Sequence, residues 1–163
     1  MRKSANVTFF SSSLRYDEDL VEREDFDDGF DLTQRRGRSK VRRRAPGVVL
    51  VSYEGMATEE VVPEIAAFLE DEIARAGKIR FFVDAGDLIT YTTEYRKAWT
   101  VWLKAHRSDL GEVQMLVRSR IVRMGINVVN PLVGNFLIAY SERGEFESAL
   151  DDAVVSASTR RTG

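Results

Sequence analysis

Two carboxylates three residues apart, Asp84 and Asp87, are the residues of this chain whose type and spacing first suggest chemistry. They follow the apolar residues 81–83 and enclose Gly86, which predicts a buried strand that ends in an acidic loop. A carboxylate pair at a strand end can bind a metal ion or serve as acid and base. We favour the simpler interpretation, in which Asp84 caps neighbouring backbone N–H groups and Asp87 is solvated.

Two adjacent hydroxyls, on Thr92 and Thr93, lie at the start of the next helical pattern. A phosphate on either residue would lie at the positive end of a helix dipole, where it is stabilised. Ordinary N-capping by one of them is the alternative, and we favour it. Together with Asp84 and Asp87, these threonines form our candidate phospho-acceptor or docking loop.

A basic run occupies residues 35–44 and ends in Arg42, Arg43 and Arg44, which are our candidate basic contact. Such a run can bind nucleic acid or acidic lipid. However, it lacks the interleaved aromatic residues of a base-stacking platform, and residues 17–31 just before it carry nine acidic residues. Pairing of the two blocks, or a basic edge strand that discourages aggregation, is therefore favoured over nucleic acid.

Three aromatic side chains, Trp99, Trp102 and His106, recur at helical spacing on one face. They could form an exposed docking stripe, but aromatic residues at this spacing are more often core, and we favour that reading. A lone histidine without a serine, cysteine or carboxylate at a known spacing is not a catalytic signal.

The composition excludes several kinds of chemistry. The chain has no cysteine and one histidine, which rules out disulfides, thiol catalysis and a multi-histidine metal site. The formal net charge of −2 and the absence of a long apolar run give no reason to expect nucleic acid or a membrane span. We expect a cytoplasmic, bacterial, non-enzymatic protein with no cofactor and no metal, and homo-oligomerisation stays open.

The periodic segments predict the elements that position these residues. A strand pair is expected around a turn at Pro46 and Gly47, followed by strands at residues 79–83, 113–117 and 136–140 and by helices at residues 58–76, 93–107, 121–130 and 141–155. Gly77 and Pro131 are the expected helix ends, with Thr58 and Ser119 as N-caps. Helical crossovers join parallel strands, so we predict an α/β fold with a small mixed, mostly parallel sheet and helices packed on it.

The charge pattern also suggests how the chain is divided. We expect residues 1–38 to be a charge-segregated N-terminal extension outside the main core, with a short strand at residues 6–10. Residues 39–156 would form the α/β domain, and residues 157–163 a flexible tail.

This order of elements resembles the STAS fold, and residues 40–155 are similar to the SpoIIAA-like (STAS/SEC14-related) family. The resemblance rests on Gly55 before an acidic helix led by Thr58, the sequence GKIRFFVD at residues 77–84, a Trp-bearing helix that ends near His106, and EFESAL at residues 145–150. It implies a non-enzymatic regulatory or scaffolding module that docks a protein partner through the loop after the central strand and the start of the following helix.

The resemblance also suggests a switch and two rival functions. Anti-anti-sigma relatives carry an Asp-Ser-Ser-Gly signature whose serine a partner kinase phosphorylates; here Tyr91-Thr92-Thr93-Glu94 keeps hydroxyls but lacks the Asp and Gly. A SEC14-like module for a small apolar ligand or lipid is the first alternative, and it requires an apolar cavity between sheet and helices. A nucleic-acid-associated protein that uses the basic run is the second.

Overall fold

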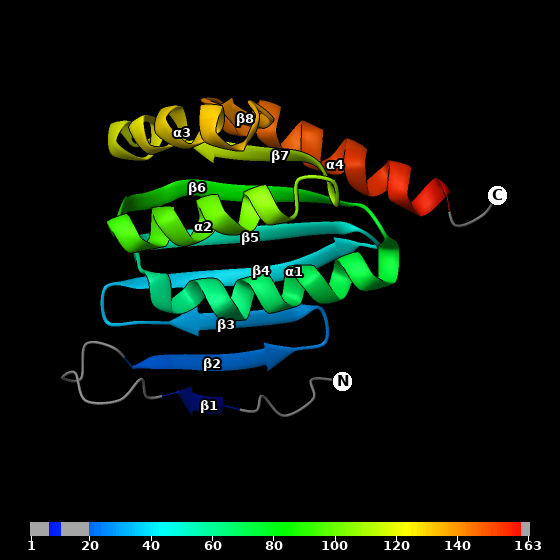
Figure 1. Ribbon diagram of the computed structural model, residues 1–163. Coiled ribbons are helices and arrows are strands. Elements are labelled where there is room, and N and C mark those ends of the chain that lie inside the picture. The colour runs from blue at the N-terminus through cyan, green and yellow to red at the C-terminus, as the bar shows by residue number, and fades with distance from the viewer. Residues whose placement is uncertain (1–6, 11–19, 161–163) are drawn as a thin grey trace.

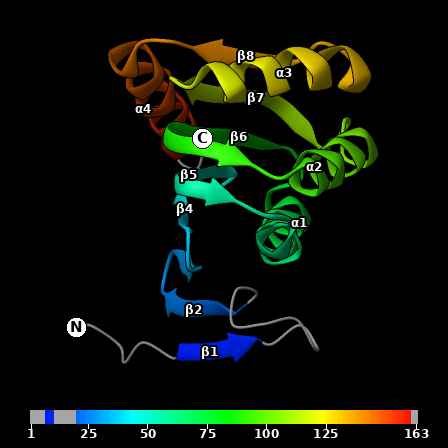
Figure 2. The same cartoon turned by 90° about the vertical axis from the view of Figure 1, so that its left-hand side faces the viewer.

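The molecule is built on one eight-stranded sheet whose strands lie in the order of the chain, β1 to β8 (Figure 1). The computed structural model describes the backbone of residues 7–10 and the whole of residues 20–160. Helices α1, α2 and α3 cover one face of the sheet, and α4 lies on the other (Figure 2). The predicted α/β fold with a mixed sheet is confirmed.

The sheet is less parallel than the sequence predicted, because four of its seven described strand pairings are antiparallel. Strands β1 to β5 pair in a meander, and the predicted hairpin around Pro46 and Gly47 is its last turn. Gly47 has a φ of 75°, a value that glycine adopts without strain. The bounds are β1 Val7–Phe10, β2 Val21–Phe26, β3 Gly29–Thr33, β4 Gly37–Ala45 and β5 Val48–Ala57.

The other half of the sheet is parallel, because a helix carries the chain back before each new strand. Strands β5 to β8 pair in parallel. The remaining strands are β6 Ile79–Tyr91, β7 Leu110–Val117 and β8 Leu137–Tyr140. The helices are η2 Glu59–Val61, α1 Val62–Ala76, α2 Thr93–Ala105, α3 Arg120–Val133 and α4 Arg143–Thr159.

Two hydrophobic clusters lie on opposite faces of the sheet. The larger one joins the inner faces of α1, α2 and α3 to the strands, with Ile65, Trp99 and Ile126 among its members. The smaller one joins α4 to the sheet through Phe82 and Phe146, whose ring centroids are 6.0 Å apart. Central strand β6 is therefore apolar on both sides, as its composition predicted.

The expectation that residues 1–38 lie outside the main core is wrong for residues 21–38. Strands β2 and β3 are part of the sheet, and Val21, Phe30 and Leu32 belong to the larger hydrophobic cluster. Alternation along β3 directs Phe30 and Leu32 into the core and places Asp31 on the other face. The strand expected at residues 6–10 is confirmed as β1, whereas the acidic residues 17–19 lie outside the described residues.

Two expected ends of elements also differ. Pro131 does not end α3, which continues to Val133 and is capped by left-handed Gly134. Val129 and Val133 are buried in the core, so packing of the last turn outweighs the hydrogen bond that proline removes. The expected tail from residue 157 is helical to Thr159, at the end of α4, and residues 161–163 lie outside the described residues.

Candidate functional site

The predicted acidic loop after residue 83 is a strand. β6 runs without interruption to Tyr91, so Asp84 and Asp87 lie within the sheet. The register against β5 shifts between the Ser52–Asp84 and Glu54–Asp87 pairs, which identifies a β-bulge at this point. The composition Asp-Ala-Gly-Asp is typical of a loop, but the neighbouring strands β5 and β7 supply the ladder that keeps it extended.

The carboxylate of Asp84 is held by α4. Arg143, the first residue of α4, donates from Nη1 to Asp84 Oδ2 at 2.8 Å and from Nη2 to Oδ1 at 3.3 Å. Gly86 N also donates to Asp84 Oδ1, at 3.0 Å. The hydrogen bond to Asp84 raises the pKa of the Arg143 guanidinium. Asp84 therefore joins β6 to the start of α4, while Asp87 is exposed, and the pattern matches a structural role for Asp84.

Thr92 is the N-cap of α2. Its Oγ1 accepts from Tyr95 N at 3.2 Å and donates to Glu59 Oε2 at 2.7 Å. Its backbone N donates to Ala57 O at 3.0 Å, so Thr92 joins the ends of β5 and β6. The connection after β6 is this one residue, and α2 begins at Thr93, which is exposed.

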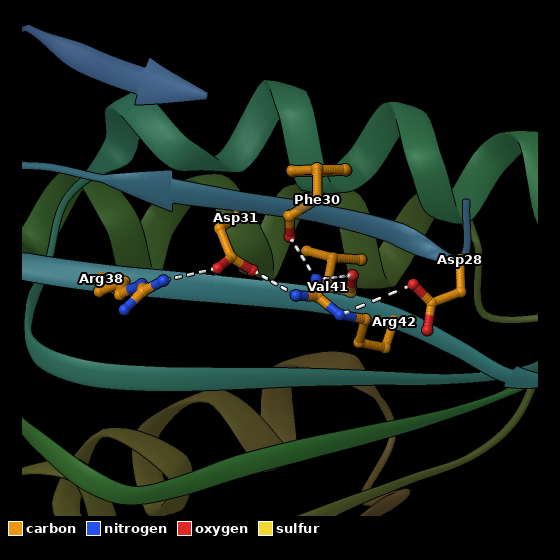
Figure 3. Close-up of polar contacts among 6 residues, drawn as sticks. All are labelled: Asp28, Phe30, Asp31, Arg38, Val41 and Arg42. Carbon is orange, nitrogen blue, oxygen red and sulfur yellow. Dashed lines mark hydrogen bonds and ion pairs between the residues drawn. The ribbon is translucent and has the colours of Figure 1, made fainter. Parts of the chain in front are cut away.

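Most of the basic run lies on strand β4, and two of its arginines pair with residues of the preceding acidic block, as predicted. Figure 3 shows Asp31 between two guanidinium groups: Arg38 Nη2 lies 2.7 Å from Oδ2, and Arg42 Nη2 lies 2.7 Å from Oδ1. Arg42 also donates to Phe30 O at 3.0 Å, and its Nε lies 3.8 Å from Asp28 Oδ1. Arg42 is therefore occupied within the sheet.

The three candidate basic contacts differ in their surroundings. Arg43 lies on the helix side of β4, where Nε is 2.6 Å from Glu72 Oε2. Arg44 is exposed. Only part of the run is thus free to meet a partner, and the structure separates Arg42, Arg43 and Arg44 rather than uniting them in one patch.

Glu72 is a buried carboxylate that the sequence analysis did not identify. Its carboxylate is buried on α1, pairs with Arg43 and accepts from Gly47 N at 2.9 Å. The sequence contains the pattern that would have identified Glu72. Ile65, Leu69 and Glu72 are spaced to share one helical face, which places a carboxylate at a core-facing position. The contacts attach α1 to the β4–β5 turn and account for the burial.

The aromatic stripe on α2 is core, as predicted. Trp99 and Trp102 are buried, and the Trp102 indole stacks on the His106 ring with centroids 4.4 Å apart. The two ring nitrogens of His106 lie 3.2 Å from Glu70 Oε1 and 3.2 Å from Asp109 Oδ2. His106 is thus a partnered, half-buried histidine.

A cavity of about 90 Å³ lies beneath α2 and α3. Its walls are apolar and aromatic, and the lining includes Tyr53, Tyr91, Trp99, Val122 and Ile126. Burial raises the pKa of the Tyr53 hydroxyl. Within the described part of the chain, Trp99 Nε1 is buried and makes no hydrogen bond. The volume of this cavity could not be predicted from the sequence, although the predicted aromatic face of α2 contributes Trp99 to its lining.

Comparison with solved structures identifies the fold. An anti-sigma factor antagonist from Mycobacterium paratuberculosis superposes with a TM-score of 0.50 and 15% sequence identity, covering 71% of this chain and 95% of that one. The chain has a STAS-like fold. A Shewanella loihica protein described as having a SpoIIAA-like fold covers 91% of this chain and 96% of its own, with a TM-score of 0.49 and 13% identity. At such identities the likeness concerns the fold alone.

The other comparisons identify no relative of this STAS-like chain. No protein-family model matches it, and no curated protein matches its sequence. Within residues 7–10 and 20–160, no helix combines the length and apolar character needed to cross a membrane.

Proposed function

We propose that this STAS-like domain is a non-enzymatic regulatory module that docks a protein partner at the carboxyl edge of its parallel strands, around the start of α2. The observation that carries the proposal is the exposed position of Thr93 as the first residue of α2. Its hydroxyl makes no hydrogen bond within the described residues, and it lies beside the positive end of the helix dipole. The fold likeness to an anti-sigma factor antagonist supports a protein as the partner.

Thr93 is a better candidate for contact or phosphorylation than Thr92. The Thr92 hydroxyl already donates to Glu59 and accepts from Tyr95 N, so modification would break the cap of α2. A phosphate on Thr93 would meet free N–H groups of the first turn. Asp84 and Asp87 lie on β6, the strand that precedes Thr92. In this proposal the exposed Asp87, rather than the paired Asp84, is available for contact with the partner.

The experiment compares Thr93→Glu and Thr93→Ala with the wild type. A partner captured from native lysate is purified and titrated against each form. We expect Thr93→Glu to weaken binding at least tenfold while the melting temperature changes little, because the exposed side chain supports no packing. Ser148→Glu, at an exposed position of α4, is the matched control and should bind normally. Equal affinity for wild type, Thr93→Glu and Ser148→Glu would contradict the proposal.

The cavity favours a second candidate function, the binding of a small apolar ligand. Its volume of about 90 Å³ is below the roughly 150 Å³ of an engineered cavity that admits benzene. A lipid chain would therefore require α2 and α3 to separate. Titration of wild type and Ala85→Val with indole, followed by the melting temperature, tests this function. Indole should raise the melting temperature of the wild type but not that of Ala85→Val, whose larger side chain fills the cavity. If indole raises the melting temperature of neither form, this function is contradicted.

A further inference from the structure

Helix α3 is apolar on its outer face as well as its inner face. Its inner residues lie in the core. On the outer face, four large apolar side chains are 52%, 67%, 51% and 53% exposed: Ile121, Met124, Val128 and Leu132. Their spacing of three, four and four residues places them in one ridge, about 16 Å long at 1.5 Å per residue.

The other helices do not share this feature: the exposed large apolar side chains of α2 and α4 are single ones, Val101 and Val155. Exposed charged groups include Asp71 and Arg75 on α1, Lys97 and Lys104 on α2, and Asp151 on α4. α3 is also the last helix of its layer and has only α2 beside it (Figure 2). The apolar residues of α3 therefore extend beyond the face that packs on the core, and a contiguous exposed apolar patch is typical of an interaction site.

The charges that α3 itself carries are all positive. Residues 120–133 contain no acidic residue. Arg118 and Arg120 are exposed at the start of α3, and neither makes an ion pair or side-chain hydrogen bond among the described residues. The occupant of this face should therefore bring apolar side chains together with negative charge.

Two other occupants fit less well. In a symmetric pair of chains, the outer face of one α3 would lie against the outer face of the other. Because α3 contains no acidic residue, Arg118 and Arg120 would find no carboxylate on the α3 of the second copy. A membrane surface favours basic residues along the whole helix and aromatic anchors, whereas here the free cations lie at one end and the outer ridge has no aromatic side chain.

We infer that the outer face of α3 is a docking surface for a protein partner that presents an amphipathic helix with acidic flanks. The ridge of Ile121, Met124, Val128 and Leu132 would pack against the apolar face of that helix, as the side-chain ridge of one helix packs into the groove of another. Arg118 and Arg120 would contact its acidic flank. This surface goes beyond the proposed contact at Thr93, and it uses different residues.

The test uses the full chain and two synthetic helical peptides of identical leucine ridge, one flanked by Glu and the other by Lys. We expect the wild type to bind the Glu-flanked peptide at least tenfold more tightly than its twin. Met124→Glu combined with Val128→Glu should lose this binding, whereas Thr93→Glu should keep it. Val155→Glu, at an exposed apolar position of α4, is the matched control. Arg118→Glu combined with Arg120→Glu should reverse the peptide preference.

Several results would overturn the inference. Equal affinity for both peptides, or binding that survives Met124→Glu with Val128→Glu, would show that the ridge does not select an acidic helix. If the protein binds neither peptide but sediments together with phosphatidylglycerol vesicles, the outer face of α3 would be assigned to a membrane. A concentration-dependent dimer that Val128→Glu abolishes would assign it to a second copy.

Discussion

Asp31 shows how a surface charge pattern can produce a buried ion pair. The sequence predicted that the acidic block and the basic run would neutralise each other, and the structure confirms this for Asp28 and Asp31. What the pattern could not give is burial: the Asp31 side chain is 5% exposed because Arg38 and Arg42 cover it. Strand register places the two arginines as diagonal neighbours of Asp31, and register is not a property of composition.

The first prediction concerns this carboxylate. Asp31→Asn keeps the shape but removes the negative charge that lies between two guanidinium groups, of which only Arg42 retains a second carboxylate, Asp28. We expect the free energy of unfolding to fall by about 2 kcal/mol, below the range for fully buried pairs because both arginines are partly exposed. Urea denaturation of the purified protein measures the change.

Asp28→Asn is the internal control for Asp31→Asn. Asp28 is 57% exposed and lies 3.8 Å from Arg42, so its substitution should change stability by less than about 0.5 kcal/mol. Equal losses in the two variants would show that burial of Asp31 adds nothing to the pairing.

At the scale of elements, α1 is attached to the antiparallel half of the sheet by ion pairs at both ends. Arg23 of β2 pairs with Glu64, and Arg43 of β4 pairs with Glu72 eight residues later. The guanidinium of Arg23 also lies 4.0 Å from the centroid of the Phe30 ring. Hydrophobic periodicity predicted that the helices and strands exist. It could not predict these ion pairs, because they depend on which strands lie next to α1 in the folded molecule.

The candidate site shows the same limit. Periodicity placed Thr92 at a helix start, and the structure makes it the cap. Periodicity also ended the central strand at residue 83, because Asp84, Gly86 and Asp87 are rare inside strands. The β-bulge and the contact with Arg143 arise from neighbours distant in sequence, and local pattern carries no information about them.

The second prediction tests the attachment of α1. Glu72→Gln removes the charge that faces Arg43 while it keeps an acceptor for Gly47 N. We expect a loss of about 2 kcal/mol in the free energy of unfolding, because a buried hydrogen bond to a charged group is stronger than an exposed one. Asp71→Asn, at the neighbouring exposed position of α1, should change it by less than about 0.5 kcal/mol. Guanidinium or thermal denaturation of both variants decides whether the buried contact is stabilising.

At the scale of the whole molecule, one sheet unites a charged antiparallel half with an apolar parallel half. α/β topology and helix order were predictable from the alternation of strand and helix patterns. The membership of β2 and β3 was not, because charge density suggested a solvated segment. On β3, Asp31 lies on one face while Phe30 and Leu32 occupy the other, so composition averaged over the segment hid the alternation.

The third prediction follows from this integration and concerns two truncations. Removal of residues 1–38 takes away Val21, Phe30 and Leu32, each worth roughly 1.5–3 kcal/mol of burial. The sum approaches the whole stability of a typical domain, about 5–15 kcal/mol. Removal of residues 1–19 keeps all three residues and both ion pairs to α1. We therefore expect the shorter truncation to melt cooperatively and the longer one to lose its cooperative transition in circular dichroism. A cooperative melt with a native-like spectrum after removal of residues 1–38 would show instead that residues 39–156 form an autonomous domain, as the charge pattern first suggested, and that β2 and β3 are an addition to it.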